Sequence, residues 1–382
     1  MNSSAAFAPT PTATTEAMND APFMRAALNL ARRGLGTVWP NPAVGCVIVK
    51  DGEVVGRGWT QPGGRPHGET EALARAGDKA NGATAYISLE PCAHHGKTPP
   101  CADALIAAGI ARAVVAMEDP DPRVSGRGLK RLREAGIAVA TGLCAQEAGE
   151  LNAGFFKRIG EGRPLVMLKL AATLDGRIAT SHGESQWITG EAARNRAHLL
   201  RATHDAVMVG VGTVIADDPQ LTCRLPGLER RSPVRIVIDG SLRTPLTAKL
   251  VVEAKLVPTW IIHRHGADAT RCQTLRDCGV DLIEVPVSET VEMDLTVAFT
   301  ELGKRGLTRV LVEGGASLAG ELLEEGLVDR LAWFHAPMLM GGDGLAAIQA
   351  FGIERLSAAP KFRRLSLETI GEDVLDTLTL VR

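Results

Sequence analysis

Short apolar runs alternate with polar, helix-forming segments along most of this chain. Residues 44–49 and 83–89 are nearly continuous apolar runs, which is typical of buried strands. Residues 22–33 instead predict a helix, and Asp20 is placed to cap its start. Because this alternation continues, we expect the first part of the chain to form a three-layer α/β domain.

A change in composition marks a boundary near the middle of the chain. Residues 158–164 are charged, contain glycine and end in proline, which is typical of a linker. New strands are predicted after it, among them 206–209 and 234–238, with helical segments between them. A chain of 382 residues is also longer than one ordinary domain. We therefore expect one α/β domain over residues 18–160 and a second over residues 164–382.

The composition also limits where the protein acts and on what. Residues 1–17 are rich in Ala, Thr, Ser and Pro, and no Lys or Arg precedes Arg25, so they predict a disordered tail rather than a targeting segment. No apolar run is long enough to cross a membrane, and seven Cys without a short secreted framework favour a reducing compartment. The expected location is the cytoplasm. A net charge of -2 gives no broad cationic surface for nucleic acid.

The segment from residue 66 to residue 101 carries the most specific chemistry. His67, Cys92 and Cys101 offer one imidazole and two thiolates, a donor set that suits tetrahedral zinc with one position left open. Zinc lowers the pKa of bound water to about 7. Glu69 follows the His by two residues and can move protons without binding the metal. This combination is the signature of hydrolytic deamination of a nucleobase-like ring.

Two other interpretations of these residues are open. The first takes His67 as a surface residue and the two Cys as buried thiols, although the joint pattern disfavours that. A structural zinc site is the second alternative. It needs a fourth ligand, for which His94 and His95 are available, but it leaves Glu69 without a role.

The spacing of the two Cys points to one family. They are separated by eight residues in PCAHHGKTPPC, and WPNPAVG lies upstream. Together these segments resemble the deaminase domain of the bifunctional riboflavin-biosynthesis deaminase/reductases. The resemblance implies a cytidine-deaminase-like fold, with His67, Cys92 and Cys101 as metal ligands and Glu69 as the proton shuttle. One departure is Gly68, where the family usually has Ala.

The same resemblance suggests further contacts in the first domain. Asn41 is expected to meet the pyrimidine edge, and Lys97 and Thr98 are expected to reach a ribose phosphate. Solvated loop residues are the alternative for all three. The segment DPDPRVSGRG also matches the family, with Asp121 where Asn is common.

Three segments stand out in the second part: residues 168–179, 204–224 and 310–323. The second combines a strand, a glycine turn and a polar end, and the third a strand, a glycine turn and a helix. A glycine turn that leads into a helix start can hold a phosphate. The usual dinucleotide fingerprint is absent, because Ile215 stands where a third glycine is required. Each glycine turn taken alone is a weak signal that favours a structural turn over a phosphate site.

Together these three segments resemble the reductase domain of the same family, whose fold is similar to dihydrofolate reductase. The resemblance implies NADPH-dependent reduction of a ribose to ribityl. It places cofactor contacts at Ala171, Trp187, Thr213, Asp217, Gly240, Gly315, Ala316, Ser317, Leu318, Ala319, Gly320 and Glu321. It places substrate contacts at Ser185, Arg201, Leu221, Arg224 and Glu313. For Lys169, Asp175 and Trp187, a site role and an ordinary structural role are both open.

The sequence thus predicts a bifunctional riboflavin-pathway enzyme with zinc and NADPH as cofactors. It would deaminate 2,5-diamino-6-(5-phosphoribosylamino)pyrimidin-4-one with a zinc-activated hydroxide and then reduce the ribose. Its partners would be a small phosphoribosyl pyrimidine and, as the resemblance implies, further copies of itself, with no nucleic acid and no membrane. The alternatives are a deaminase of nucleic-acid bases with a C-terminal binding module, and a structural-zinc domain joined to a nucleotide-binding regulator.

Overall fold

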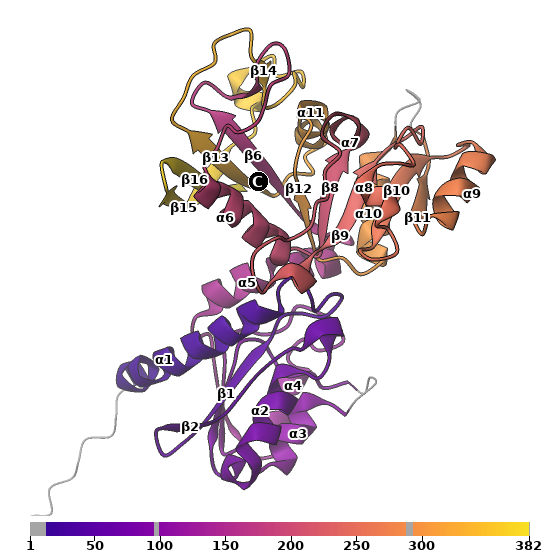
Figure 1. Cartoon of the computed structure of the whole chain (residues 1–382). Coiled ribbons are helices and arrows are strands. Elements are labelled where there is room, and N and C mark those ends of the chain that lie inside the picture. Colours follow the sequence, from indigo (N-terminus) through magenta and orange to yellow (C-terminus); the bar gives the residue numbers. More distant parts are fainter. Residues whose placement is uncertain (1–12, 95–98, 288–292, 382) are drawn as a thin grey trace, which may run out of the picture. The chain divides into compact units, whose positions relative to one another are not determined.

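The computed structural model describes residues 13–94, 99–287 and 293–381. They divide into two units, one with the residues up to 34 and residues 41–156, the other with residues 35–40 and the chain from 157 onward (Figure 1). No pattern in the sequence predicted that residues 35–40 belong to the second unit. They are held there because Trp39 packs on its apolar core and Arg231 donates a hydrogen bond to the carbonyl of Leu35 (2.7 Å).

The first unit is a five-stranded sheet in the order β2-β1-β3-β4-β5. β1 pairs antiparallel with β2 and β3, and the β3–β4 and β4–β5 pairs are parallel. The strands are β1 (Gly45–Lys50), β2 (Glu53–Trp59), β3 (Thr84–Ile87), β4 (Arg112–Val115) and β5 (Ala138–Thr141). The helices are α1 (Ala13–Ala31), α2 (Gly68–Ala76), α3 (Cys101–Ala107), α4 (Arg127–Glu134) and α5 (Ala145–Glu161), with single 3₁₀ turns at Arg32–Gly34, Pro62–Gly64 and Gly77–Ala80.

Helices cover both faces of this sheet, as the alternation of apolar residues requires. Figure 1 shows α2, α3 and α4 on one face and α1 and α5 on the other. Cys46 and Ile48 of β1 point into the core formed with α2, α3 and α4, and Val47 between them is buried on the opposite face. The three-layer architecture places the starts of α2 and α3 at the same edge of the sheet.

The predicted first helix is present, but its start and its cap were predicted wrongly, and residues 13–17 of the expected tail belong to it. α1 starts at Ala13 and contains Pro22 in its interior, and the first twelve residues of the expected tail lie outside the described residues. Asp20 does not cap the helix. Its carboxylate accepts hydrogen bonds from the Tyr86 hydroxyl (2.7 Å) and from two guanidinium nitrogens of Arg112 (3.0 and 2.7 Å). Asp20 therefore forms hydrogen bonds with side chains that are distant in the sequence instead of capping the start of the helix.

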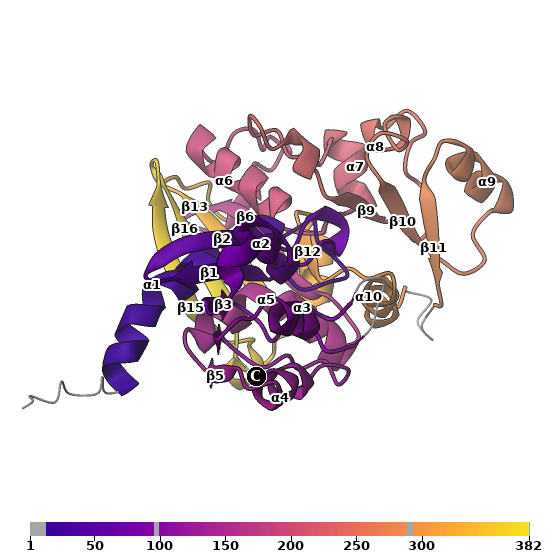
Figure 2. The same ribbon diagram turned by 90° about the horizontal axis from the view of Figure 1, so that it is seen from below.

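The second unit is built on a nine-stranded sheet in the order β11-β10-β9-β8-β12-β6-β13-β16-β15, which Figure 2 shows running from β11 at one end to β15 and β16 at the other. Its strands are β6 (Leu165–Thr173), β8 (Ala206–Gly210), β9 (Val234–Ile238), β10 (Thr259–Arg264), β11 (Asp281–Val285), β12 (Arg309–Val312), β13 (Arg330–Ala336), β15 (Phe362–Ile370) and β16 (Asp373–Leu380). The strands from β11 to β13 are parallel, and β16 and β15 are antiparallel. β7 (Arg177–Ala179) and β14 (Leu345–Ala346) form a separate small sheet.

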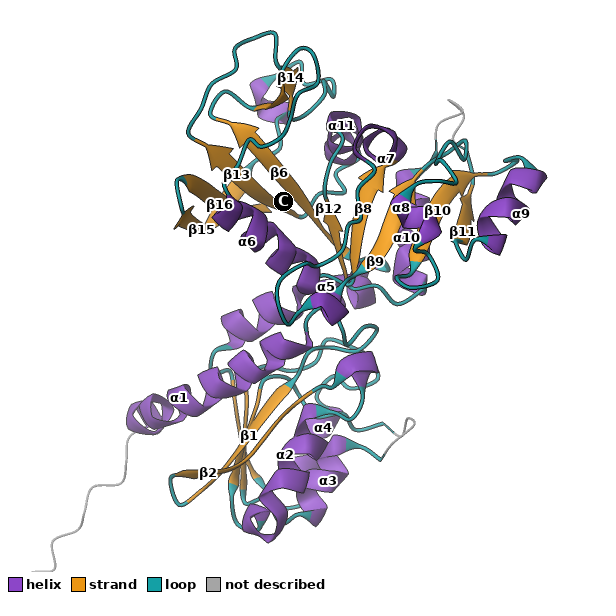
Figure 3. Ribbon diagram, viewed as in Figure 1, coloured by secondary structure: helices purple, strands orange, loops and turns teal. Residues whose placement is uncertain are grey.

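Helices again cover both faces (Figure 3). They are α6 (Glu191–Ala202), α7 (Val211–Asp217), α8 (Lys249–Val252), α9 (Ala269–Asp277), α10 (Leu295–Lys304) and α11 (Ala316–Glu324), with 3₁₀ turns at Glu229–Arg231 and Leu356–Ala358. Alternate residues of β8 face opposite cores: Met208 packs with α10 and α11, and Val209 packs with α7 and α8. Ligands of such sheets bind at the carboxyl ends of the parallel strands, here the ends of β6, β8, β9 and β12.

Candidate active sites

The three candidate metal ligands lie together in the first unit. His67 Nδ1 is 3.3 Å from Cys101 Sγ and 3.7 Å from Cys92 Sγ, and the ligand atoms all lie within 4.8 Å of one another. Zinc binds thiolate sulfur at about 2.3 Å and imidazole nitrogen at about 2.0 Å, so one ion fits between these atoms. His94 is not part of this cluster, and His95 lies outside the described residues, so the described residues supply three ligands.

Local structure explains how these ligands are held. His67 is the residue before α2, Cys101 is the first residue of α3, and Cys92 lies in the loop after β3. The backbone N–H of Cys101 donates to Cys92 Sγ (3.3 Å). Hydrogen bonds from Cys101 and His67 lower the pKa of the Cys92 thiol to about 4, against the opposing effect of burial. A thiolate is the form that binds metal.

Glu69 lies in the first turn of α2, beside the metal ligands. Its side chain is buried, at 2% exposure, and burial raises the pKa of its carboxyl to about 7. A carboxyl group with a pKa near neutrality can both accept and return a proton at physiological pH. The structure therefore places a carboxyl group suited to proton transfer next to the metal-competent cluster.

Gly68 is required where it stands. A Cβ at this position would lie 2.7 Å from the carbonyl oxygen of Val44 and 3.2 Å from Cα of Trp59. The absence of a side chain lets the start of α2 approach the β1–β2 hairpin closely. The departure from the family pattern thus belongs to the packing that sets His67 and Glu69 in place.

The other predicted contacts of the first domain are only partly described. The Asn41 side chain donates a hydrogen bond to the carbonyl of Gly64 (2.8 Å). Lys97 and Thr98 lie outside the described residues. Asp121 pairs with Arg123 (2.5 Å), which lowers the pKa of the Asp121 carboxyl, and its carboxylate also accepts the backbone N–H of Arg123 (2.9 Å).

Sequence reasoning missed Glu90, a buried carboxylate two residues before Cys92. One of its oxygens accepts the backbone N–H groups of Asp119 (3.1 Å) and Gly126 (3.0 Å), and the other accepts those of Gly128 (2.8 Å) and Leu129 (3.2 Å). Glu90 thereby ties the Cys92 loop to the DPDPRVSGRG segment. The sequence shows Glu90 next to Pro91 and Cys92. It does not indicate the hydrogen-bond partners of Glu90, because they come much later in the chain.

We expect Glu90→Gln to lower the kcat/KM of deamination about ten- to a hundredfold, because an amide nitrogen would face backbone donors that it cannot bind. Steady-state ammonia release and zinc content of the purified variant are the measurements. The exposed Glu134 of α4 provides the matched control, Glu134→Gln, which should behave like the parent. Unchanged deamination in Glu90→Gln would contradict a positioning role.

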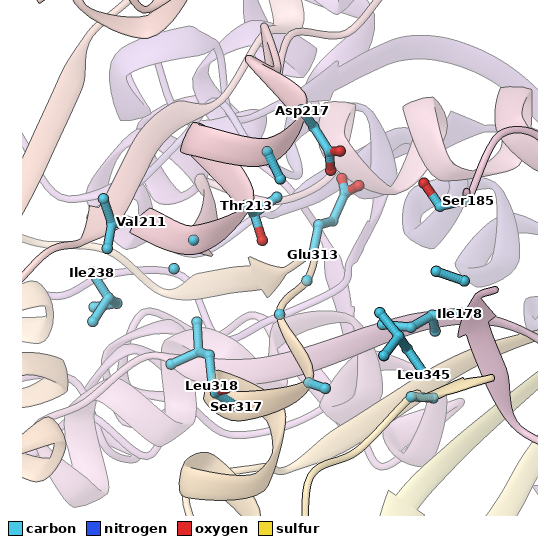
Figure 4. Close-up of a pocket in the computed structure, with 18 of the residues that line it drawn as sticks. Ile178, Ser185, Val211, Thr213, Asp217, Ile238, Glu313, Ser317, Leu318 and Leu345 are labelled. Carbon is cyan, nitrogen blue, oxygen red and sulfur yellow. The ribbon is translucent and has the colours of Figure 1, made fainter. Parts of the chain in front are cut away.

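The second unit contains a cavity of about 680 Å³ at the carboxyl ends of β6, β8, β9 and β12 (Figure 4). Most residues that the resemblance assigns to the cofactor line it: Ala171, Thr213, Asp217, Gly240, Gly315, Ala316, Ser317, Leu318 and Glu321. Ser185 lines it as well. Gly314 and Gly315 have φ values of 121° and 84°, which favour glycine, and they form the turn into α11. Ala319 and Gly320 are buried inside α11.

A smaller cavity of about 140 Å³ adjoins the first. It is lined by Trp187, His198, Arg201 and Arg224, and it shares Lys169 and Glu313 with the larger cavity. Trp187 is not a core residue, since 65% of its surface is exposed and the guanidinium of Arg194 stacks 4.5 Å from its ring. Leu221, which the resemblance assigns to the substrate, instead belongs to the buried apolar core.

Charged groups concentrate on the wall between the two cavities. Arg201 donates two hydrogen bonds to the carboxylate of Glu313 (2.5 and 2.9 Å) and a third to the carbonyl of Thr222 (2.9 Å). Burial alone would raise the pKa of Glu313, but Arg201 and Lys169 outweigh it and hold that pKa at about 2. Burial lowers the pKa of Lys169, and Glu313 opposes this shift. An anion and an ammonium group thus face the junction.

Asp175 has a structural role in this unit. Its carboxylate accepts the backbone N–H groups of Met340 (3.2 Å) and Gly341 (2.7 Å) and so fixes the loop before β14.

In the part of the chain that the structure describes, no helix has the length and apolar character needed to span a membrane.

Fold and sites together define a chain that joins a zinc-binding deaminase domain to a reductase domain. Residues 18–117 match the cytidine and deoxycytidylate deaminase zinc-binding region, and residues 164–375 match the RibD C-terminal domain. Riboflavin biosynthesis protein RibD of Escherichia coli (strain K12) is 46% identical over 368 residues, covering 94% of this chain and 98% of the relative. RibD of Aquifex aeolicus is 43% identical, covering 93% and 97%.

Solved structures of similar proteins support the same assignment. Acinetobacter baumannii RibD has a TM-score of 0.85 at 40% identity, over 96% of this chain and all of that one (100%). A Thermotoga maritima diaminohydroxyphosphoribosylaminopyrimidine deaminase/5-amino-6-(5-phosphoribosylamino)uracil reductase has a TM-score of 0.83 at 34% identity, covering 96% and 100%. This chain belongs to the RibD family of riboflavin biosynthesis proteins. The predicted fold class is confirmed, and the chain is a bifunctional riboflavin-pathway enzyme that uses zinc and NADPH.

Proposed function

We propose that residues 18–160 deaminate 2,5-diamino-6-(5-phosphoribosylamino)pyrimidin-4-one and that residues 164–382 reduce the ribose of the product to ribityl. The observation that carries the first assignment is the buried Glu69 beside His67, Cys92 and Cys101. Two cavities that meet at a charged wall support the second assignment.

In the deamination, water adds to the ring carbon that carries the amino group, ammonia leaves, and a carbonyl remains. Zinc held by His67, Cys92 and Cys101 supplies the Lewis acid that makes water nucleophilic near neutral pH. Glu69 accepts a proton from the attacking water and delivers it to the departing amine. Its burial suits this role, because a carboxyl with a pKa near 7 loses and gains protons readily at neutral pH.

In the reduction, bound NADPH would provide the hydride for the ribose C1′ carbon, and the protein would provide a proton. The larger cavity would hold the cofactor, with its phosphates at the glycine turn before α11. Arg201 and Arg224 would hold the substrate phosphate in the smaller cavity, since guanidinium groups match phosphate oxygens. Lys169 and Glu313 border both cavities, where hydride and substrate would meet. We assign proton supply to the Lys169 ammonium group, and the ionised Glu313 stabilises its positive charge.

Removing the metal tests whether deamination depends on zinc while ribose reduction does not. We expect prolonged treatment with a chelator to abolish ammonia release while NADPH oxidation continues when the deaminated intermediate is supplied. The reason is that all three ligands lie in the first unit. Activity would be followed through ammonia and through nicotinamide absorbance, before and after zinc is restored. Ammonia release without metal would contradict the zinc mechanism, and no NADPH oxidation by the untreated protein would contradict the reductase assignment.

The proposal extends to location and assembly. We infer a cytoplasmic enzyme, supported by its seven free cysteines, which suit a reducing compartment. We also infer a homo-oligomer on family resemblance alone. Light scattering of the purified protein tests this assembly, and a mass equal to one chain would overturn it.

A further inference from the structure

Arg243 lines the larger cavity but has no role in the functions assigned so far. It follows the end of β9, in a turn that also brings Gly240 to the cavity wall. The residue is exposed, and no acceptor or carboxylate among the described residues pairs with its guanidinium. An arginine side chain thus lines this space with no ion-pair partner among the described residues.

The turn that carries Arg243 is braced from within the protein. The buried Asp239 carboxylate accepts the backbone N–H of Arg243 (2.9 Å), the N–H of Thr244 (2.7 Å) and the Thr244 hydroxyl (2.7 Å). Leu242 is buried in the apolar core, and Arg271 donates hydrogen bonds to the carbonyls of Leu242 (3.2 Å) and Thr244. The backbone beneath Arg243 is therefore fixed before any ligand arrives, which reduces the entropy lost on binding.

The position of Arg243 separates it from the reacting groups. Lys169 is on β6 and Glu313 follows β12, whereas Arg243 follows β9. The strand order β9-β8-β12-β6 places three strand spacings, about 14 Å in all, between β9 and β6. Figure 4 shows Ile238, the last residue of β9, on the side of the cavity away from Ile178 and Leu345.

A dinucleotide with its nicotinamide at Lys169 and Glu313 would place its adenosine toward the β9 end of the cavity. Between the two ends lies the glycine turn of α11, which suits the pyrophosphate. We propose that Arg243 binds the 2′-phosphate of that adenosine and thereby sets the preference for NADPH over NADH. This inference rests on the proposed reductase function. The chemistry fits, since a guanidinium forms paired hydrogen bonds with phosphate oxygens and NADH carries only a hydroxyl there.

The test compares Arg243→Gln with Arg276→Gln, a control at an exposed arginine of α9 outside the cavity. Isothermal titration calorimetry with NADP⁺ and with NAD⁺ measures binding without turnover, and kcat/KM for NADPH and NADH is measured in parallel. In Arg243→Gln, NADP⁺ affinity should fall about ten- to a hundredfold, with NAD⁺ affinity changed by less than about twofold. Arg276→Gln should match the parent, and thermal melting checks that both variants fold.

Several other outcomes would overturn this role of Arg243. Unchanged NADP⁺ affinity in Arg243→Gln, or an equal loss for NADP⁺ and NAD⁺, would overturn the role of Arg243 while leaving the reductase function intact. Equal affinity of the unsubstituted protein for the two dinucleotides would overturn it as well. Binding of neither dinucleotide by the unsubstituted protein would overturn the proposed reductase function, and this inference with it.

Discussion

Glu69→Gln is expected to lower ammonia release from the pyrimidine substrate about 10²- to 10⁴-fold, the usual contribution of a positioned proton carrier. Gln has nearly the same shape and can occupy the same buried position at the start of α2, but it cannot carry the proton between water and the leaving amine. Because Glu69 is not one of the three ligand residues, zinc content should stay at the level of the parent.

Steady-state ammonia release and metal analysis of the same preparation are the measurements for this variant. Glu71→Gln is the matched control, since Glu71 lies on the same helix and pairs with Arg75 at the surface. NADPH oxidation with the deaminated intermediate should be unchanged in both. Full ammonia release from Glu69→Gln would refute the proton-shuttle role, and loss of zinc would show that the carboxylate supports the metal site instead.

Glu313→Gln is expected to lower the kcat of ribose reduction by about 10²-fold or more. The substitution removes the anion that faces Arg201 and Lys169 on the wall between the cavities. Arg201 would lose two charge-assisted hydrogen bonds. Lys169 would become a buried cation without its stabilising partner, so its pKa would fall further and less of it would carry a proton.

Single-turnover oxidation of NADPH with the deaminated intermediate measures this effect, and ammonia release serves as an internal reference. Glu324→Gln is the matched control, because Glu324 is an exposed carboxylate at the end of α11, the helix that follows Glu313. Reduction at the parental rate in Glu313→Gln would exclude Glu313 from the reaction. A raised KM with unchanged kcat would assign it to substrate binding alone.

The deaminase site could be predicted from the sequence because its chemistry is carried by residues close together in the chain. His67 and Glu69 are two positions apart, and Cys92 and Cys101 flank one loop. Local secondary structure then brings them to one sheet edge, since the starts of α2 and α3 lie at the same end of the layers. The reductase segments were harder to interpret, because each glycine turn alone is more typical of a structural turn than of a phosphate site.

Other features depend on contacts between distant parts of the chain. Asp20 is a residue type that favours helix caps, yet its carboxylate binds Tyr86 and Arg112. Paired hydrogen bonds to a guanidinium stabilise it more than one hydrogen bond to a helix backbone N–H would. A side chain at Gly68 would come within 2.7 Å of the Val44 carbonyl oxygen, a contact between segments more than 20 residues apart. No periodicity in the sequence indicates which backbone will approach which.

The sequence by itself determined the two-domain α/β class and the candidate metal-ligand set with a carboxylate beside it, since apolar periodicity and ligand spacing are local properties. Only the tertiary structure decided that residues 35–40 belong to the second unit and that Glu90 ties two loops together. It also decided that Lys169 and Glu313 form one wall between two cavities. These are consequences of which strands become neighbours in a sheet, and strand order is set by packing over the whole domain rather than by any single segment.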